Sequence, residues 1–469
     1  MATFSKANGL RIPLVARASM ALLLLSATAT EAFALTQEEA RHLALRTGDA
    51  AVPGRIDSFI PLSRAQAVDK ALAGLRTQPQ IGKPAWADQL PQDTSKMTAE
   101  QRTAYFDMRS KQRQELPTWW YMEMMATSSP LTERLVLFWH DHFTSSLAKV
   151  NSAQMMWKQN QLFRSLGTTN FASLLGAIVR DPAMLIYLDN NRNVARAPNQ
   201  NLARELMELF TLGVGNYTEA DVAEVARALT GHTVNGATEA FRFDTANHDA
   251  GEKTILGQRG KFKAEDVVRI LLAHPKTAER IVGKLWQEFV SPTPDPAQVS
   301  RLAADFRASG YQMKPLLRAL FLTDAFWSTA NRASLVKHPA ELVVHTARGL
   351  SLPARETMNL YGQAKRMGQA LFEPPNVAGW PAHLTWIDSM TLPARQNYIT
   401  NAVTLWRNEV APAVFKTKPT TLPRLDQAGL DRLNGQYLSV GPTYVQPAAP
   451  VEMSAALRAV LLDAGFQTK

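Results

Sequence analysis

The chain has 469 residues, of which 46% are hydrophobic and 20% are charged, and its net charge is +10. This length and composition exclude a mainly disordered protein and allow one large domain or two ordinary domains with a buried core. The sequence contains no cysteine, which excludes disulfides, thiolate nucleophiles and thiolate metal sites. Any metal ion would therefore bind through His, Asp or Glu.

The first 34 residues have the three parts of a signal peptide. The positively charged start consists of Lys6, Arg11 and Arg17. A short apolar stretch follows with residues 22–25 at its centre, and Ala32-Phe33-Ala34 fits a cleavage site. The apolar stretch has about half of the roughly 20 residues that a membrane anchor needs. We therefore expect a cleaved signal peptide over residues 1–34, no transmembrane segment afterwards, and a periplasmic or secreted protein.

The predicted mature chain, which starts at Leu35, remains basic. Its net charge is +8, because the signal peptide takes away three cations and one anion. The basic residues alternate with acids instead of forming a stripe, and export removes the protein from nucleic acid, so we expect no nucleic-acid partner. An anionic envelope polymer, a lipid surface and an acidic protein stay open as partners. Solubility alone also explains the excess charge.

Most of the chain repeats apolar residues with the period of a helix. The predicted helices cover residues 62–75, 98–127, 131–147, 153–165, 199–212, 218–229, 264–273, 277–290, 296–308, 313–322, 336–349, 357–371 and 391–408. Aromatic alternation and glycines over residues 241–257 favour one small β-hairpin or extended insertion. The expected fold is all-α, with a large multi-helical single domain over residues 35–410.

The pattern changes near residue 411. Three prolines, at positions 412, 419 and 423, interrupt the helical periodicity. A second proline-rich stretch runs from Pro442 to Pro450 and precedes a predicted short helix over residues 452–464. We expect residues 411–469 to form a proline-rich linker and a C-terminal helical tail that packs on the main domain.

The sequence Phe138-Trp139-His140-Asp141-His142-Phe143 is the first segment with residues suited to chemistry. On a helix, His140 and His142 diverge by about 200°, so a shared metal site requires the helix to end or kink there. Otherwise each histidine is structural and bonded to a neighbour. Trp139 lies in the apolar arc and is assigned to the core.

A second segment, residues 198–209, carries two carboxylates at i, i+3. Glu205 and Glu208 share a polar flank of the predicted helix and could act as acid and base or bind a cation. Arg204, four residues before Glu208, offers a plainer explanation as an ion pair, which leaves Glu205 freer. Asn199 suits the helix cap, and Asn201 and Arg204 are assigned to the structural part of the motif.

The third segment is the proline-rich loop Phe372 to Pro381, followed by Trp386. Prolines including Pro375 stiffen the backbone, and Gly379 permits a turn, so Trp380 and Trp386 are presented from a rigid platform. If they are exposed, the two indoles could stack on sugars or on a partner, with Asn376 beside them. If they are buried, they close the end of a helical bundle.

Together these motifs resemble a known bacterial family, domain of unknown function 1800. The segments that carry the resemblance are residues 138–143, 181–189, 201–213, 217–231, 274–275 and 374–380. The resemblance covers roughly residues 35–408 and implies a mainly helical, frequently exported protein without an established activity. Genes of this family often neighbour those of domain of unknown function 1501, which is similar to alkaline phosphatases and sulfatases, so a protein of that family is the expected partner. Relatives often have Glu, Trp and Asn where this chain has Gln200, His232 and Asp141.

Three functions remain open from the sequence. The leading one is a non-catalytic or accessory helical scaffold that binds an envelope partner through the aromatic loop and a basic face. The first alternative is a hydrolase of an envelope polymer, with Glu205, Glu208 and His140 as acid and base. In its metal-dependent form, His140, His142 and Glu205 hold a divalent ion, with His232 or Asp189 nearby. The second alternative is a glycan-binding module that uses exposed Trp380 and Trp386.

Overall fold

The computed structural model of the chain describes residues 34–48, 54–355, 358–444, 446 and 448–469. The predicted signal peptide, residues 1–34, lies outside this part except for Ala34. In the described part, helices dominate and the only sheets are three small two-stranded ones, which confirms the predicted all-α class with a small β insertion. None of the described helices combines the length and the apolar character that crossing a bilayer requires.

The first half of the described chain forms a succession of helices of very different lengths. They are α2 (Gln37–Arg46), α3 (Arg64–Ala73), α4 (Ala99–Ala126), α5 (Pro130–His142), α6 (Leu147–Val150), α7 (Ala153–Ser165), α8 (Phe171–Ile178), α9 (Pro182–Tyr187), α10 (Asn201–Met207) and α11 (Glu219–Ala228). Two antiparallel hairpins follow. Their strands are β1 (His232–Asn235) with β2 (Ala240–Phe243), and β3 (Lys253–Ile255) with β4 (Gln258–Gly260).

The second half continues in the same way and returns to the body of the molecule. Its helices are α12 (Ala264–Ala273), α13 (Pro275–Phe289), α14 (Pro296–Ala308), α15 (Met313–Phe321), α16 (Asp324–Trp327), α17 (Pro339–Gly349), α18 (Leu360–Arg366), α19 (Thr391–Leu405), α20 (Ala411–Phe415), α21 (Gln427–Tyr437), α22 (Met453–Leu462) and α23 (Ala464–Gln467). A last small sheet pairs β5 (Arg424–Leu425) with β6 (Val451–Glu452).

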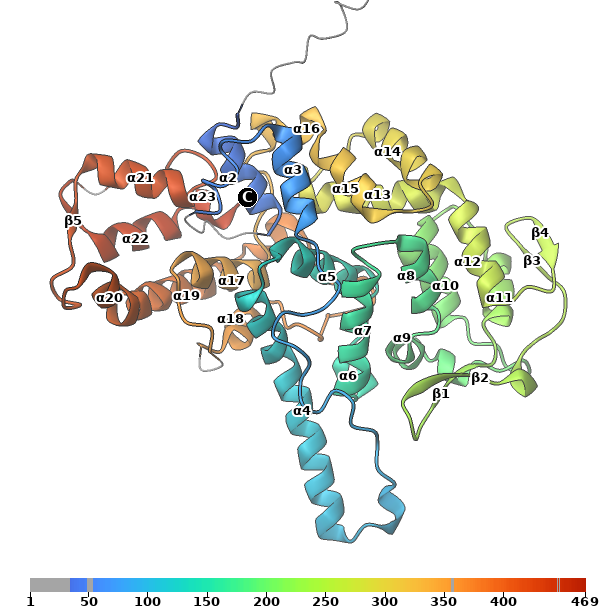
Figure 1. The fold of residues 1–469 in the computed structure, drawn as a ribbon. Helices are drawn as coiled ribbons and strands as arrows, with labels where there is room; N and C mark the ends of the chain where they lie inside the picture. Colours follow the sequence, from blue (N-terminus) through green and yellow to red (C-terminus); the bar gives the residue numbers. More distant parts are fainter. Residues whose placement is uncertain (1–33, 49–53, 356–357, 445, 447) are drawn as a thin grey trace, which may run out of the picture.

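Helix α5 lies at the centre of the molecule (Figure 1). On one side are α8 to α12 with the two hairpins, and on the other are α19 to α22. Helix α4 projects away from the body, and the segment before it runs back along it to form an arm. One hydrophobic cluster extends from Leu43 of α2 to Leu457 of α22, so the tail shares the core of the main body.

A buried ion pair joins three of the central helices. Arg164 of α7 donates from Nε and Nη2 to the two carboxylate oxygens of Glu133 on α5, at 2.9 and 2.7 Å. The indole Nε1 of Trp120 on α4 donates to the same carboxylate at 2.8 Å. Arg164 has a side-chain exposure of 0% and Glu133 one of 4%. The base of the arm is therefore tied to α5 and α7 by a group that water does not reach.

The structure departs from the predicted elements at several points. Helix α5 ends at His142, five residues before the predicted end, because Phe143 leaves the helical region with φ −101°. The predicted helix over residues 199–212 is α10 followed by a π-helical turn, Glu208–Leu212. The single hairpin predicted within residues 241–257 is instead two hairpins that begin earlier, at His232. At residue 411 the helix continues through a π-helical turn, Trp406–Val410, into α20.

Candidate functional site

Two of the sequence motifs meet where α5 ends. The loop of residues 372–386, hereafter the proline loop, packs against the last turn of α5. The backbone N–H of Phe372 donates to Nε2 of His140 at 3.1 Å. The backbone N–H of Trp380 donates to Oδ1 of Asp141 at 2.7 Å. Since these bonds use side chains of α5 and backbone of the loop, they fix the loop in position over the helix end.

Gly379 allows the loop to come this close. Its φ is +91°, which side chains of L-residues rarely adopt, and a Cβ atom there would lie 2.3 Å from Oδ1 of Asp141 and 2.8 Å from its carbonyl oxygen. Asn376 closes the turn before it, because its side-chain oxygen accepts from the N–H of Ala378 at 2.8 Å. The glycine predicted to permit a turn thus also permits a close contact with α5.

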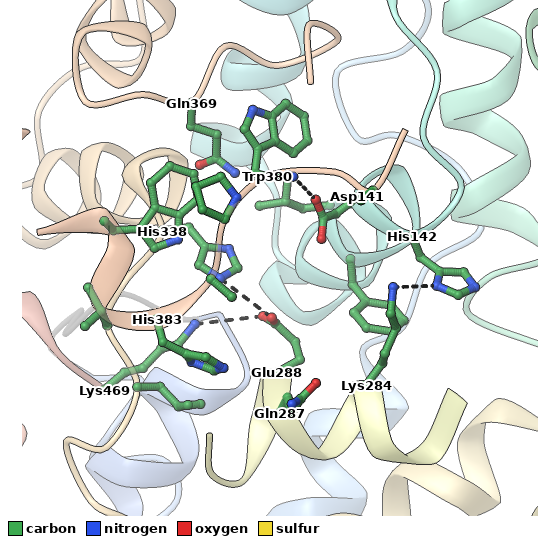
Figure 2. A pocket seen from close by; sticks show the side chains of 18 residues that line it. Asp141, His142, Lys284, Gln287, Glu288, His338, Gln369, Trp380, His383 and Lys469 are labelled. Carbon is green, nitrogen blue, oxygen red and sulfur yellow. Dashed lines mark hydrogen bonds and ion pairs between the residues drawn. The ribbon is translucent and has the colours of Figure 1, made fainter. Parts of the chain in front are cut away.

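A cavity of about 210 Å³ opens beneath the proline loop. It is bounded by the end of α5, by α13, by the start of α17, by the proline loop and by the last residue of the chain. Its polar and aromatic lining includes Asp141, His142, Lys284, Gln287, Glu288, His338, Gln369, Trp380, His383, Trp386 and Lys469. Figure 2 shows Lys284 and Glu288 extending from α13, with Asp141 above them. The cavity therefore gathers carboxylates, amines and imidazoles from five parts of the fold.

Asp141 is an acid with an unusual proton affinity. Burial raises the pKa of its carboxyl group to about 6, although the N–H of Trp380 and the charge of Lys284 favour the ionised form. A carboxyl group with this pKa is protonated in a useful fraction of molecules near neutral pH and can donate a proton.

Glu288 has a pKa that is shifted in the opposite direction from that of Asp141. Burial disfavours its charge, but the neighbouring cations outweigh burial, and its pKa lies below the usual value. Arg134 contacts Oε1 at 2.8 Å, His338 lies 3.7 Å from Oε2, and Lys469 lies 3.9 Å from Oε1. Glu288 is therefore ionised over the whole range in which Asp141 titrates.

Lys284 stands one helical turn before Glu288. Its Nζ lies 3.2 Å from Nδ1 of His142. Nε2 of His142 lies 3.1 Å from the carbonyl oxygen of Phe210, which can only accept, so Nε2 carries the proton and Nδ1 accepts from the lysine. Burial holds the pKa of His142 well below its ordinary value and lowers the pKa of Lys284 to about 8.

The structure does not bring together the predicted metal ligands His140, His142 and Glu205. Helix α5 stays regular through both histidines, so their side chains diverge as the helical period requires. His140 packs against Trp120 and Phe372, burial lowers its pKa to about 3, and it is a structural histidine. Among the described residues, no three His, Asp or Glu side chains are grouped so that they could share a metal ion.

The predicted acid and base, Glu205 and Glu208, lie outside the cavity. Arg204 pairs with Glu219 at 2.7 Å, not with Glu208 as its i, i+4 spacing suggested. Glu208 instead accepts from the hydroxyl of Tyr217 at 2.6 Å. Burial and the charge of Glu208 raise the pKa of Glu205.

The remaining residues of the predicted sets have structural contacts. Asn201 lies 3.4 Å from the carboxylate of Asp189, which itself pairs with Lys149. His232 is buried and lies 3.2 Å from the carbonyl oxygen of Val179. Neither Asp189 nor His232 lines the cavity beneath the proline loop. Trp139 is fully buried in the core, as expected.

Trp380 and Trp386 are buried, with 7% and 2% of their surface exposed, and they pack with Val336. The two indoles are therefore not exposed on the surface, whereas the glycan-binding hypothesis expected exposed indoles. Within the part of the chain that the structure describes, neither indole Nε1 has a hydrogen-bond partner. Both side chains form part of the cavity wall. Pro375 and Asn376 are exposed, and so are Ala378, Pro381, Ala382, Leu384 and Thr385 of the same loop.

Sequence reasoning missed most of the polar groups in the cavity. Lys284 and Glu288 have the i, i+4 spacing of an ordinary surface pair, so nothing in the pattern set them apart. His338 precedes a proline and starts α17 as its N-cap, which is also a common structural role. Lys469 reaches the cavity only because residues 335–337 pair with the chain end, where the N–H of Lys469 donates to the carbonyl of Leu335 at 2.8 Å.

Comparison with known proteins gives a family and nothing more specific. A family model described as "Protein of unknown function (DUF1800)" matches residues 42–467. Searches of curated proteins and of solved structures found no match. The cavity must therefore be interpreted from its own residues.

Proposed function

Since the chain belongs to the family of proteins of unknown function DUF1800, we propose its function from the site itself: it is an exported acid/base hydrolase of an envelope polymer. The observation that carries the proposal is one cavity lined by two carboxyl groups, Asp141 and Glu288, whose pKa values are displaced in opposite directions, upward for Asp141 and downward for Glu288. When two carboxyl groups have pKa values shifted in opposite directions, one can donate a proton while the other is an ionised base at the same pH. The predicted signal peptide supports export.

The two carboxyl groups of the cavity have different roles in the proposed reaction. Glu288 accepts a proton from a water molecule as the water oxygen attacks the bond to be cleaved. Asp141 gives its proton to the leaving oxygen, while its Oδ1 stays bonded to the N–H of Trp380. Lys284, in the wall of the same cavity, contributes positive charge to it. A carboxylic acid that donates a proton and a carboxylate that activates water are the two groups that hydrolysis of a glycosidic bond uses.

The test is release of reducing ends from isolated cell-envelope polysaccharide by the purified mature chain. We expect Glu288→Gln to lower kcat/KM by about 100-fold or more, since general base catalysis contributes about that much. The rate should fall as the pH rises above about 6, because Asp141 must be protonated. Glu265→Gln, which changes an exposed carboxylate paired with Arg180, is the matched control and should leave the rate unchanged.

Asp141→Asn separates activity from stability. The folded pKa of about 6 exceeds that of an unfolded aspartate, so the native state binds more protons, and this stabilising contribution is lost as the pH rises through 6. Asn keeps the acceptor for Trp380 and removes the charge. We expect a higher melting temperature than the native chain at pH 8, a smaller difference at pH 4, and loss of activity at both. A variant that keeps full activity would contradict the proposed acid.

Partner binding stays a second candidate because of the arm. Four large apolar side chains on it are exposed: Ile81, Leu90, Phe106 and Met108. Phe106 and Met108 belong to α4, which projects from the body (Figure 1), and Leu90 lines one surface hollow with Met108. Ile81 lies at the base of the arm, where its N–H donates to Glu123. Exposed apolar groups gathered on a projection are typical of a protein-binding surface. We propose an exported protein of the domain of unknown function 1501 family as the partner.

A pull-down from periplasm with the tagged mature chain tests this candidate. We expect the native chain to capture the partner and Leu90→Ser/Phe106→Ser to capture at least tenfold less. Val414→Ser, at a similarly exposed apolar residue of α20, is the matched control. Equal capture by all three chains would show that the arm does not bind it.

A further inference from the structure

Lys284 is a cation in the cavity wall without a close counter-ion. It belongs to α13 and faces the cavity beside His142 (Figure 2). Among the described residues its one hydrogen bond joins Nζ to Nδ1 of His142, and no carboxylate oxygen lies within 4.0 Å of it. By contrast, Lys469 in the same cavity contacts Glu341 at 2.5 Å. The amine of Lys469 is therefore already paired with a carboxylate, whereas the amine of Lys284 can still pair with an anionic ligand.

His142 holds the amine of Lys284 in one orientation. An ammonium group has three N–H donors, and Nδ1 of His142 takes one of them. The histidine cannot compete for the proton, since burial and the charges of Lys284 and Arg280 keep it neutral. Two donors of Lys284 consequently stay available.

The surrounding charges leave this cation only partly balanced. Asp141 of α5 attracts it from beyond ion-pair distance, and Arg280 of α13 repels it. Glu288, on the same helix, is already matched by Arg134 at 2.8 Å. A buried charge without a close partner is costly, and an anionic group that enters the cavity offsets that cost.

We propose that Lys284 binds the anionic substituent of the substrate, and that the substrate is an acidic polysaccharide of the envelope. This inference rests on the proposed function, because it specifies the polymer on which the same cavity acts. The net charge of +8 expected for the mature chain favours the approach of such a polymer. A carboxylate, a phosphate and a sulfate substituent share the chemistry that Lys284 recognises.

Protection of Lys284 from acetylation tests the proposal on the native chain. The protein is treated with acetic anhydride at pH 8 in the presence of sodium glucuronate, glucose, inorganic phosphate or sulfate, and modified lysines are located by peptide mass spectrometry. We expect glucuronate or one of the inorganic anions to slow the acetylation of Lys284 at least tenfold. Glucose should not slow it. The most effective anion identifies the substituent. Equal protection by glucose, or none by any anion, would overturn the proposal.

Calorimetric titration of variants gives an independent measurement. Lys284→Met should weaken binding of the protecting anion by at least tenfold, and Lys284→Arg should retain part of it. Lys276→Met is the control on the same helix, since Lys276 is half-exposed and paired with Glu279 at 2.7 Å. Undiminished binding in Lys284→Met would contradict the assignment. If that variant does not fold, the protection experiment decides.

Binding is measured here without turnover, so the two proposals can fail separately. If anions bind at Lys284 but the chain releases no reducing ends from any polymer, the anion site stands and the proposed hydrolase activity is refuted. If the chain hydrolyses a neutral polymer and anions do not protect Lys284, the proposed hydrolase activity stands and the proposed acidic substrate is refuted.

Discussion

Glu133→Gln is expected to lower the free energy of unfolding by about 3–5 kcal/mol, because it leaves Arg164 with a buried charge and no counter-ion. Arg164 is fully buried, and its two donors to Glu133, at 2.9 and 2.7 Å, are its only contacts with an acid among the described residues. The same change weakens the bond from Trp120. Urea denaturation followed by circular dichroism measures the effect.

Two further variants show that the effect comes from the unpaired charge. Glu133→Leu/Arg164→Met removes both charges and should recover a large part of the loss, since apolar replacement of a buried pair is often tolerated. Asp69→Asn breaks the exposed pair with Arg318 and should cost less than about 1 kcal/mol. If Glu133→Gln costs no more than Asp69→Asn, the buried pair does not secure the arm.

Gly379→Ala is expected to cost about 3 kcal/mol, from about 1–2 kcal/mol of left-handed backbone strain and the remainder from overlap with α5. The added Cβ would lie 2.3 Å from Oδ1 of Asp141 and 2.8 Å from its carbonyl oxygen. Since Asp141 cannot move without losing the N–H of Trp380, the proline loop must shift. Thermal unfolding gives the loss of stability, and the reactivity of Lys284 with acetic anhydride reports the change in the cavity.

Gly215→Ala is the matched control for this variant. Gly215 has φ +83°, and nothing lies within 4 Å of the position of its Cβ atom. The control variant therefore has the backbone strain without the steric overlap. It should lower the free energy of unfolding by about 1–2 kcal/mol and leave the reactivity of Lys284 with acetic anhydride unchanged. Equal losses in the two variants would mean that the loop is not held against Asp141.

The sequence predicted the helices well where apolar periodicity is long, as in α4 and α13. It failed where the period is interrupted locally. The helix predicted through residue 147 stops at His142, because Phe143 leaves the helical conformation with φ −101° and ψ 67°. Helix α2 was missed, although Thr36 and Glu39 form a capping box, because the buried residues Arg41, His42 and Arg46 interrupt its apolar periodicity.

The candidate site was predictable only in part, because its residues are distant in the chain. Residues 138–143 and 374–380 were singled out, and the structure joins them through Asp141 and Trp380. The direction of each side chain was not predictable from the motif, so the histidines were favoured over Asp141. Lys284 and Glu288 become distinctive only through their burial beneath the loop, which no local pattern encodes.

The bonds between the proline loop and α5 also determine how a large substrate could enter. His140, Asp141 and the N–H of Leu147, which donates to the carbonyl of Phe372 at 2.8 Å, hold the loop from one short segment, residues 140–147. Because prolines restrict the backbone of the loop, we expect an opening of the loop to release these bonds together. For the proposed hydrolase, we then expect admission of the polymer to be an all-or-none step that is independent of substrate concentration and limits turnover at saturating substrate.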